Sequence, residues 1–303
     1  MKKFLVTLIA LAVCFSLNQT VFAGGSSKVK VKYPIILVHG WAGSHLYLNT
    51  IEYFYGIEDE LEDEVDVANT SDGIFVADCI DAFNTDYVRG AQLRQFVYEV
   101  IAITGAPKVN IIGHSMGGTT ARYAASCFSD MKSRIASVTS VSTPHRGTSA
   151  AELLLMIDNG SMGALSWVMD NLWGRIASAD ERSRFIAATD QLTRAGMVDM
   201  NPRMPNVSGI AYISYATKYY GVSSGLLNNL MFPFWCWMKA REGANDGVVP
   251  VSSMKWGDYR GEVTGLFGCD HMMVVNQFFG ITPGFDAKGF YVDIAKLLSR
   301  RGY

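Results

Sequence analysis

The sequence predicts an α/β fold in which helices cover both faces of a mostly parallel central sheet. Short, continuous apolar runs recur along the chain, and polar or glycine residues end each of them. Such runs are typical of strands that are buried on both faces. Helical patterns separate the runs, and this alternation of strand and helix favours parallel pairing.

The expected strands occupy residues 34–38, 73–77, 109–113, 135–141 and 210–216. A helix is expected over 90–104, where apolar residues form one stripe and Gly105 provides a stop. A second helix is expected directly after Ser115. Seven acidic residues crowd the segment 58–66, and they indicate a solvated helix face rather than a cation site, because no ligand spacing stands out.

The N-terminus has the pattern of a secretory signal peptide over residues 1–23. Lys2 and Lys3 precede an apolar run, and Ala23 suits the cleavage site. A membrane anchor is the alternative, but the run is shorter than the roughly 20 residues that a spanning helix needs. We therefore expect one domain over 24–303, secreted to the periplasm or the extracellular space.

Composition narrows the range of partners. The formal net charge of −2 gives no reason to expect nucleic acid as a partner. Apolar residues make up 49% of the chain, which is high for a secreted protein. Part of this apolar surplus is expected on a surface that meets lipid.

The strongest motif is Gly113-His114-Ser115-Met116-Gly117. A buried strand precedes it and a helix of small residues follows, which is the setting in which G-x-S-x-G forms the nucleophile elbow of an α/β-hydrolase fold. Side chains at Gly113 and Gly117 would collide with the neighbouring strand and helix. Ser115 is therefore the predicted nucleophile, and a purely structural turn is the alternative.

A serine nucleophile needs a histidine base that a carboxylate orients. In this fold the order along the chain is serine, acid, histidine. Only His145 and His271 follow Ser115. His145 comes directly after an expected strand, where it would line or support the site. His271 lies in a loop near the end of the chain and is the predicted base, the alternative being a surface histidine.

The acid must lie between the serine and the base. Asp246 occupies a turn of Asn, Asp and Gly that leads into a short apolar stub, so its carboxylate can point back into the site. Asp270 is the rival, but its side chain and that of its neighbour His271 should diverge. Asp246 is therefore the predicted acid.

Two backbone amides are expected to stabilise the oxyanion that forms during ester cleavage. One is the N–H of Met116, directly after the nucleophile. The other is the N–H of Trp41, in the loop after the strand at 34–38, where the indole would add an apolar wall or serve only the core. A helical apolar stripe over 160–178 indicates either a core helix or a mobile lid within about 150–200.

Four cysteines remain after the predicted cleavage: Cys79, Cys127, Cys236 and Cys269. Export permits disulfides, and four cysteines allow three pairings. Cys236 and Cys269 flank the region of the acid and the base, so this pair is the favoured disulfide, with free buried thiols as the alternative. No cysteine or histidine spacing suggests zinc.

With these motifs the chain resembles the bacterial true lipases of the Pseudomonas–Burkholderia type. The similarity runs from about residue 33 to 290, in the same order and with similar spacing. The segments that carry it are 34–41, 108–118, 142–147, 245–250 and 270–277. The resemblance implies triacylglycerol lipase activity on an ester substrate at a lipid interface, a lid after the strand ending near Val141, and oxyanion donors at Trp41 and Met116.

The same family carries a structural calcium near the catalytic histidine. The resemblance implies ligands that include an aspartate two residues after that histidine and a second one about twenty residues before the acid. Met273 occupies the first position, and residues 201–241 contain no carboxylate, although Gln277 is retained. We therefore predict no metal and no other cofactor. A lipase-specific foldase, on which some members depend, is a candidate partner, and the protein is expected to be a monomer.

The alternatives differ in substrate or in class. An esterase for soluble short-chain esters, or a phospholipase, would use the same chemistry. A non-catalytic surface-binding module that reuses the fold is the alternative from another class. Ser115, Asp246 and His271 in the expected order argue against it.

Overall fold

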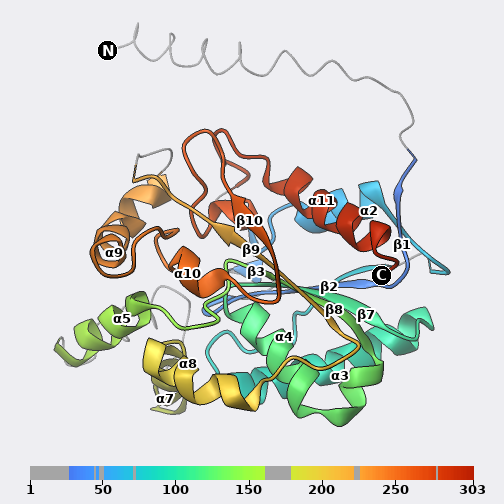
Figure 1. Cartoon of the computed structure of the whole chain (residues 1–303), viewed down its shortest axis with the longest axis horizontal. Coiled ribbons are helices and arrows are strands. Elements are labelled where there is room, and N and C mark those ends of the chain that lie inside the picture. Colours follow the sequence, from blue (N-terminus) through green and yellow to red (C-terminus); the bar gives the residue numbers. More distant parts are fainter. Residues whose placement is uncertain are drawn as a thin grey trace, which may run out of the picture.

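The computed structural model describes residues 27–43, 46–47, 51–70, 73–160, 179–221, 226–277 and 279–303 (Figure 1). The predicted signal peptide at 1–23 lies outside the described residues. Most of the predicted lid stripe at 160–178 lies outside them as well.

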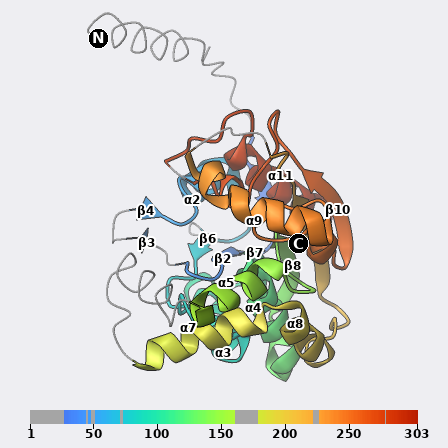
Figure 2. The same ribbon diagram turned by 90° about the vertical axis from the view of Figure 1, so that its left-hand side faces the viewer.

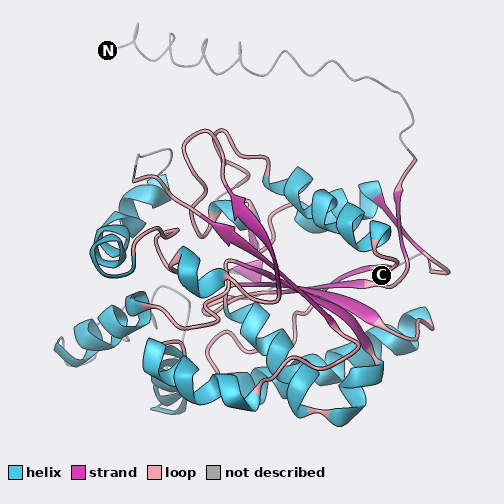
Figure 3. Ribbon diagram, viewed as in Figure 1, coloured by secondary structure: helices cyan, strands magenta, loops and turns pink. Residues whose placement is uncertain are grey.

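A six-stranded sheet forms the centre of the described molecule (Figure 3). Its strands lie in the order β10-β9-β8-β7-β2-β6. Every neighbouring pair in it is parallel. The strands are β2 (Ile35–Val38), β6 (Ile74–Val76), β7 (Val109–His114), β8 (Ile135–Val141), β9 (Ala211–Thr217) and β10 (Asp258–Val263). Two small sheets join β1 (Val29–Val31) to β5 (Val65–Val67) and β3 (Leu46–Tyr47) to β4 (Ile51–Glu52).

Helices cover both faces of this sheet, as the alternation in the sequence predicts (Figure 1). One face carries α2 (Ile57–Glu64) and α11 (Ala287–Arg300), and the other carries α3 (Asp86–Thr104) and α4 (Met116–Cys127). Alternate residues of β2 divide between two apolar clusters, Ile35 and Leu37 on the α11 side, Ile36 and Val38 on the α4 side. Burial of both sets explains why the run is apolar without alternation.

Further helices lie at one end of the sheet. Between β8 and β9 the chain forms α5 (Ser149–Gly160), α7 (Ala179–Gln191) and α8 (Arg194–Met200), and α9 (Leu226–Glu242) and α10 (Val251–Met254) follow β9. Figure 2 views this end and shows α9 above α5 and α7. Within the described ranges, no helix has both the length and the apolar character that crossing a bilayer requires.

The five expected strands are confirmed within one or two residues at their ends. The helix expected over 90–104 begins four residues earlier, at Asp86. Its first turn was not predicted because it carries buried polar residues, Asp86 and Arg89, which interrupt the apolar stripe. Gly105 ends this helix with a φ of 68°, as predicted. Strand β10 was not expected, because its sequence DYRGEV is polar and it lies at the sheet edge.

The acidic segment lies in α2 and continues into β5. Ile57 and Leu61 form the buried face of this helix. The predicted Cys236–Cys269 disulfide is wrong, since all four described cysteines are free. Cys236 lies exposed on α9, whereas Cys269 belongs to the loop that leads to His271 and is buried there. Burial raises the pKa of the Cys269 thiol well above its usual value.

Candidate active site

Ser115 lies at the sharp turn between β7 and α4, in a backbone conformation that non-glycine residues rarely adopt. Its φ is 55° and its ψ is −130°, and its N–H donates to Val141 O at 2.9 Å. A Cβ at Gly113 would lie 2.5 Å from the Gly117 backbone, and one at Gly117 would lie 2.2 Å from Val38 O. The two glycines therefore permit the turn, which stores strain of about 1–3 kcal/mol.

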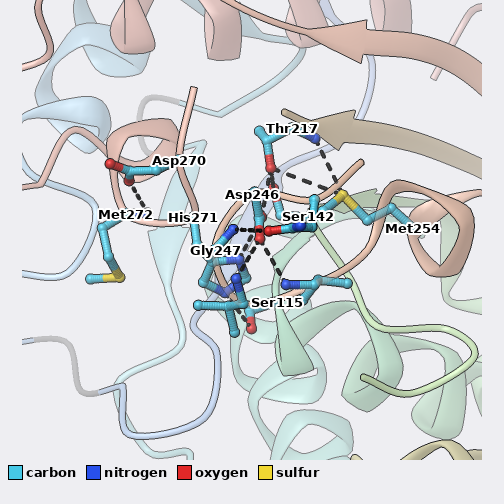
Figure 4. A network of polar contacts seen from close by, with 12 residues as sticks. Ser115, Ser142, Thr217, Asp246, Gly247, Met254, Asp270, His271 and Met272 are labelled. Carbon is cyan, nitrogen blue, oxygen red and sulfur yellow. Dashed lines mark hydrogen bonds and ion pairs between the residues drawn. The ribbon is translucent and has the colours of Figure 1, made fainter. Parts of the chain in front are cut away.

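His271 connects the serine to a buried carboxylate (Figure 4). Its Nε2 is 2.9 Å from Ser115 Oγ, and its Nδ1 is 2.7 Å from Asp246 Oδ2. The His271 N–H also donates to the Asp246 carbonyl at 3.1 Å. Ser115, His271 and Asp246 are all buried, with 7%, 5% and 0% of their surfaces exposed. The structure thus brings together the three residues that chain order predicted.

Asp246 is held in a fixed orientation by its own turn and by strand β9. Its Oδ1 accepts the N–H groups of Val248 at 2.9 Å and Val249 at 2.7 Å. Its Oδ2 accepts from Thr217 Oγ1 at 2.7 Å as well as facing His271. Ser142 Oγ lies 2.6 Å from the same Thr217 hydroxyl (Figure 4). Thr217 and Ser142, which sequence reasoning missed, therefore fix the carboxylate that faces the histidine.

Asp270, the rival acid, has a different place. Its Oδ1 accepts the N–H groups of Met272 and Met273, each at 2.8 Å, at the start of the short 3-10 helix Met273–Val275. Its side chain points away from the His271 ring (Figure 4). Burial raises the pKa of Asp270 to about 6, partly offset by the two amides. The divergence of the neighbouring side chains, expected from the sequence, is what separates the two carboxylates.

His145 is buried outside this group of three. Its ring stacks on Trp256 at a centroid distance of 5.2 Å, and its Nδ1 lies 3.2 Å from Arg122 Nη1. Burial, reinforced by the nearby Arg122, lowers the pKa of His145 well below its usual value. A neutral, stacked imidazole of this kind supports the loop after β8 rather than reaching the serine.

The loop 39–43, which we call the oxyanion loop, lies against the serine. A Cβ at Gly40 would be 2.6 Å from Ser115 Cβ and 3.1 Å from Ser115 Oγ. Met116 is the first residue of α4, where an N–H has no acceptor within the helix. The Trp41 indole packs on Phe83 and Phe185 at centroid distances of 5.3 and 5.1 Å, forming an apolar wall. That these two amides bind an oxyanion stays a prediction.

A buried arginine anchors the oxyanion loop from below. Arg89 on α3 donates through Nη2 to His39 O at 2.6 Å and through Nε to Thr120 Oγ1 at 3.1 Å. Thr120 in turn donates to Asp86 at 2.6 Å, and Gln191 of α7 donates to the same carboxylate at 2.6 Å. Burial lowers the pKa of Arg89 to about 10, opposed by Asp86. Sequence reasoning missed this network, and an Asp and an Arg three residues apart were the only signal for it.

Met273, at the position where the resemblance implies a calcium ligand, does not fit a calcium ion. Met273 is buried in an apolar cluster together with Val274 and Val275. Gln277 directs its Nε2 to backbone carbonyls, that of Tyr53 at 3.0 Å and that of Glu52. Among the described residues, no three His, Cys, Asp or Glu side chains gather as a metal site. A hard cation needs oxygen ligands, which a thioether and alkyl groups cannot supply.

Similarity to known proteins identifies the family. A family model described as the alpha/beta hydrolase fold matches residues 33–165. A triacylglycerol lipase of Vibrio cholerae is 32% identical over 305 residues, which cover 87% of this chain and 91% of that protein. The chain belongs to the bacterial lipases of the α/β-hydrolase superfamily. The predicted fold and family are thereby confirmed.

Other lipases match this member of the family over shorter stretches. Triacylglycerol lipases of Pseudarthrobacter phenanthrenivorans and Burkholderia plantarii are each 37% identical over 209 residues, or 65% of the chain. These matches span only 62% and 56% of the two relatives. The crystal structure of Staphylococcus hyicus lipase has the same fold, with a TM-score of 0.62, 17% identity, and coverage of 91% of this chain and 97% of that one.

Proposed function

We propose that this protein is a triacylglycerol lipase that cleaves its substrate through an acyl-enzyme on Ser115. The observation that carries the proposal is the hydrogen-bonded series from Ser115 through His271 to Asp246, with distances of 2.9 and 2.7 Å, at a strained strand-to-helix turn. A serine hydroxyl is a poor nucleophile unless such a base accepts its proton.

Acylation follows from this arrangement. Ser115 Oγ attacks the ester carbonyl carbon while His271 Nε2 takes the hydroxyl proton. Asp246, which faces Nδ1, holds the imidazole in the tautomer that leaves Nε2 free to accept and stabilises the imidazolium. The N–H groups of Trp41 and Met116 bind the oxyanion. When the tetrahedral intermediate collapses, His271 returns the proton to the departing alcohol oxygen.

Deacylation repeats these steps with water as the nucleophile in place of Ser115. His271 removes a proton from a water molecule as its oxygen attacks the acyl carbon, and the same two amides stabilise the second oxyanion. Collapse releases the carboxylic acid and returns the proton to Ser115 Oγ. No step needs a metal or an organic cofactor.

A lipid interface is the proposed location of the substrate. Leu266, Phe279 and Ile281 are exposed by 77%, 56% and 66%, in the loops on either side of His271. Between residues 264 and 285 the only acidic or basic side chains are Asp270 and His271, and both are buried. An exposed apolar surface without charge supports contact with lipid. The segment 160–178, with its helical apolar stripe, is proposed to be a lid, and residues 1–23 are proposed to be the export signal.

The decisive experiment compares the wild type with Ser115→Ala on emulsified triolein and on soluble p-nitrophenyl butyrate, each with and without EDTA. Ser133→Ala, at an exposed serine, is the matched control. We expect the wild type and the control to hydrolyse both substrates, with or without EDTA, and Ser115→Ala to hydrolyse neither. Full activity in Ser115→Ala would refute the mechanism, and loss of activity in EDTA would refute the absence of calcium.

The same assay separates a lipase from an esterase for soluble esters. An esterase would saturate below the solubility limit of the short ester and leave the emulsion intact. A fluorophosphonate probe tests the non-catalytic alternative, because only an activated serine forms the covalent adduct. A wild-type protein whose Ser115 is not labelled would refute the enzyme proposal altogether.

A further inference from the structure

Tyr53 lies between the oxyanion loop and the nucleophile strand. It follows β4 and precedes α2, and it is 3% exposed. Its ring packs in the apolar cluster beneath the sheet, with the Phe54 ring at a centroid distance of 5.0 Å. A phenylalanine would satisfy that packing equally well, so the hydroxyl needs a separate explanation.

The hydroxyl joins two groups that flank the reacting serine. It accepts the Gly40 N–H at 3.1 Å and lies 2.6 Å from His114 Nδ1. Burial lowers the pKa of His114 well below its usual value, reinforced by His271, so its ring is neutral. Since the hydroxyl already accepts from Gly40, its own proton is available to His114 Nδ1. The His114 ring also lies 4.6 Å from the His271 ring, centroid to centroid.

Gly40 is held on both of its backbone groups. Its N–H is bound by Tyr53, and its carbonyl accepts from Gly43 N at 3.1 Å and lies 2.9 Å from His39 Nδ1. In a planar trans peptide the N–H of the next residue points opposite to the carbonyl. Fixing Gly40 therefore fixes the direction of the Trp41 N–H, which is the proposed oxyanion donor.

We propose that Tyr53 is the positioning residue of the oxyanion loop. Its hydroxyl bridges the Gly40 N–H and His114, and it thereby holds the Trp41 N–H in the orientation that an oxyanion formed at Ser115 needs. This inference rests on the proposed function, because it assigns the Trp41 amide to the oxyanion. Tyr53 acts through Gly40 and not on the substrate. Loss of the Tyr53 hydroxyl should therefore weaken binding of the transition state more than binding of the ester substrate.

The test removes the hydroxyl and nothing else. Tyr53→Phe is compared with Tyr291→Phe, because Tyr291 lies fully buried in the same apolar cluster and its hydroxyl makes no hydrogen bond among the described residues. Both variants are assayed on p-nitrophenyl butyrate, with rates expressed per active site titrated by a fluorophosphonate. Inhibition by butylboronic acid is measured in parallel, because its serine adduct carries a tetrahedral, anionic boron.

For Tyr53→Phe we expect kcat per active site to fall by ~10- to 100-fold, less than the 10²–10³-fold cost of removing an oxyanion donor outright. KM should change by less than about twofold, and the inhibition constant of the boronic acid should rise as kcat falls. Tyr291→Phe should match the wild type. An unchanged kcat in Tyr53→Phe, or an equal loss in Tyr291→Phe, would overturn the proposal.

A second pair of variants covers the case in which Tyr53→Phe does not fold. His114→Asn keeps an oxygen that can accept from Tyr53, whereas His114→Leu does not. We expect His114→Asn to retain several-fold more kcat than His114→Leu at similar KM, and equal values would overturn the proposal. Failure of the wild type to react with the phosphonate would instead refute the proposed function, so the two failures are distinguishable.

Discussion

Replacing Asp246 with asparagine should reverse the tautomer of His271 without disturbing the fold. The Asp246 Oδ1 position accepts two backbone amides, from Val248 and Val249, at 2.9 and 2.7 Å. An asparagine oxygen must stay at that position, because an NH₂ group there would face two donors. The NH₂ group then takes the Oδ2 position, where it faces His271 Nδ1 and the Thr217 hydroxyl, both of which can accept.

The consequence for catalysis follows from the proton on the ring. If Nδ1 accepts from the side-chain amide that Asp246→Asn introduces, the single proton of a neutral His271 must lie on Nε2, which faces Ser115 Oγ. That nitrogen can then no longer take the serine proton. In serine triads this change costs ~10⁴ in kcat, or about 5.5 kcal/mol of transition-state stabilisation. Because the oxygen and the NH₂ group of the new side chain both have hydrogen-bond partners, the melting temperature should change by only a few degrees.

Asp270→Asn is the matched control for Asp246→Asn. Its Oδ1 also accepts two backbone amides, but its side chain points away from His271 (Figure 4). Both variants are assayed for kcat on p-nitrophenyl butyrate and for unfolding by circular dichroism. Asp270→Asn should keep kcat within about threefold of the wild type. The reasoning fails if Asp246→Asn retains more than about a tenth of the wild-type kcat, and the two roles are exchanged if only Asp270→Asn loses it.

Three further predictions concern stability. Burial raises the pKa of Asp270 from 3.8 to about 6, so the native state binds more protons than the unfolded state between these values. The contribution of Asp270 to stability should therefore fall by about 3 kcal/mol as pH rises through that window, and this fall should be absent from the urea unfolding of Asp270→Asn. Arg89→Met should destabilise the protein by about 3–5 kcal/mol, because it leaves the Asp86 carboxylate buried without its countercharge; a loss below about 1 kcal/mol in urea would contradict this. Gly117→Ala should cost about 1–3 kcal/mol and lower kcat, because its Cβ would lie 2.2 Å from Val38 O; unchanged melting and activity would show that the turn can relax.

The sequence was sufficient to predict the parallel sheet because its strands are buried on both faces. The strand β2 (Ile35–Val38) has no exposed position, so its composition alone marks it as buried. The edge strand β10 (Asp258–Val263) lacks that signal, since partly and fully exposed residues alternate along it. The first turn of α3 was not predicted for the opposite reason. Asp86 and Arg89 are polar and yet fully buried, so they interrupt the apolar stripe of the helix.

The three residues of the candidate site were predictable because few residues could fill each role. Only two histidines follow Ser115, and the turn around Asp246 is the clearest between Ser115 and His271. Thr217 and Tyr53 gave no comparable signal. Both are common residue types, and their roles depend on contacts with residues 29 and 61 positions away in the chain. Local patterns do not encode such separations.

Amide side chains hold the His271 loop, in which Met273 occupies the position of the calcium-ligating aspartate that the resemblance implies. Asn276 donates to Tyr55 O at 2.8 Å, and Gln277 donates to Tyr53 O at 3.0 Å. The Tyr55 N–H returns a bond to Val275 O at 3.3 Å. These bonds tie the loop after the base to the segment that also carries the Tyr53 hydroxyl. A single short segment thus contacts the oxyanion loop, the nucleophile strand and the His271 loop, so displacing it would disturb all three together.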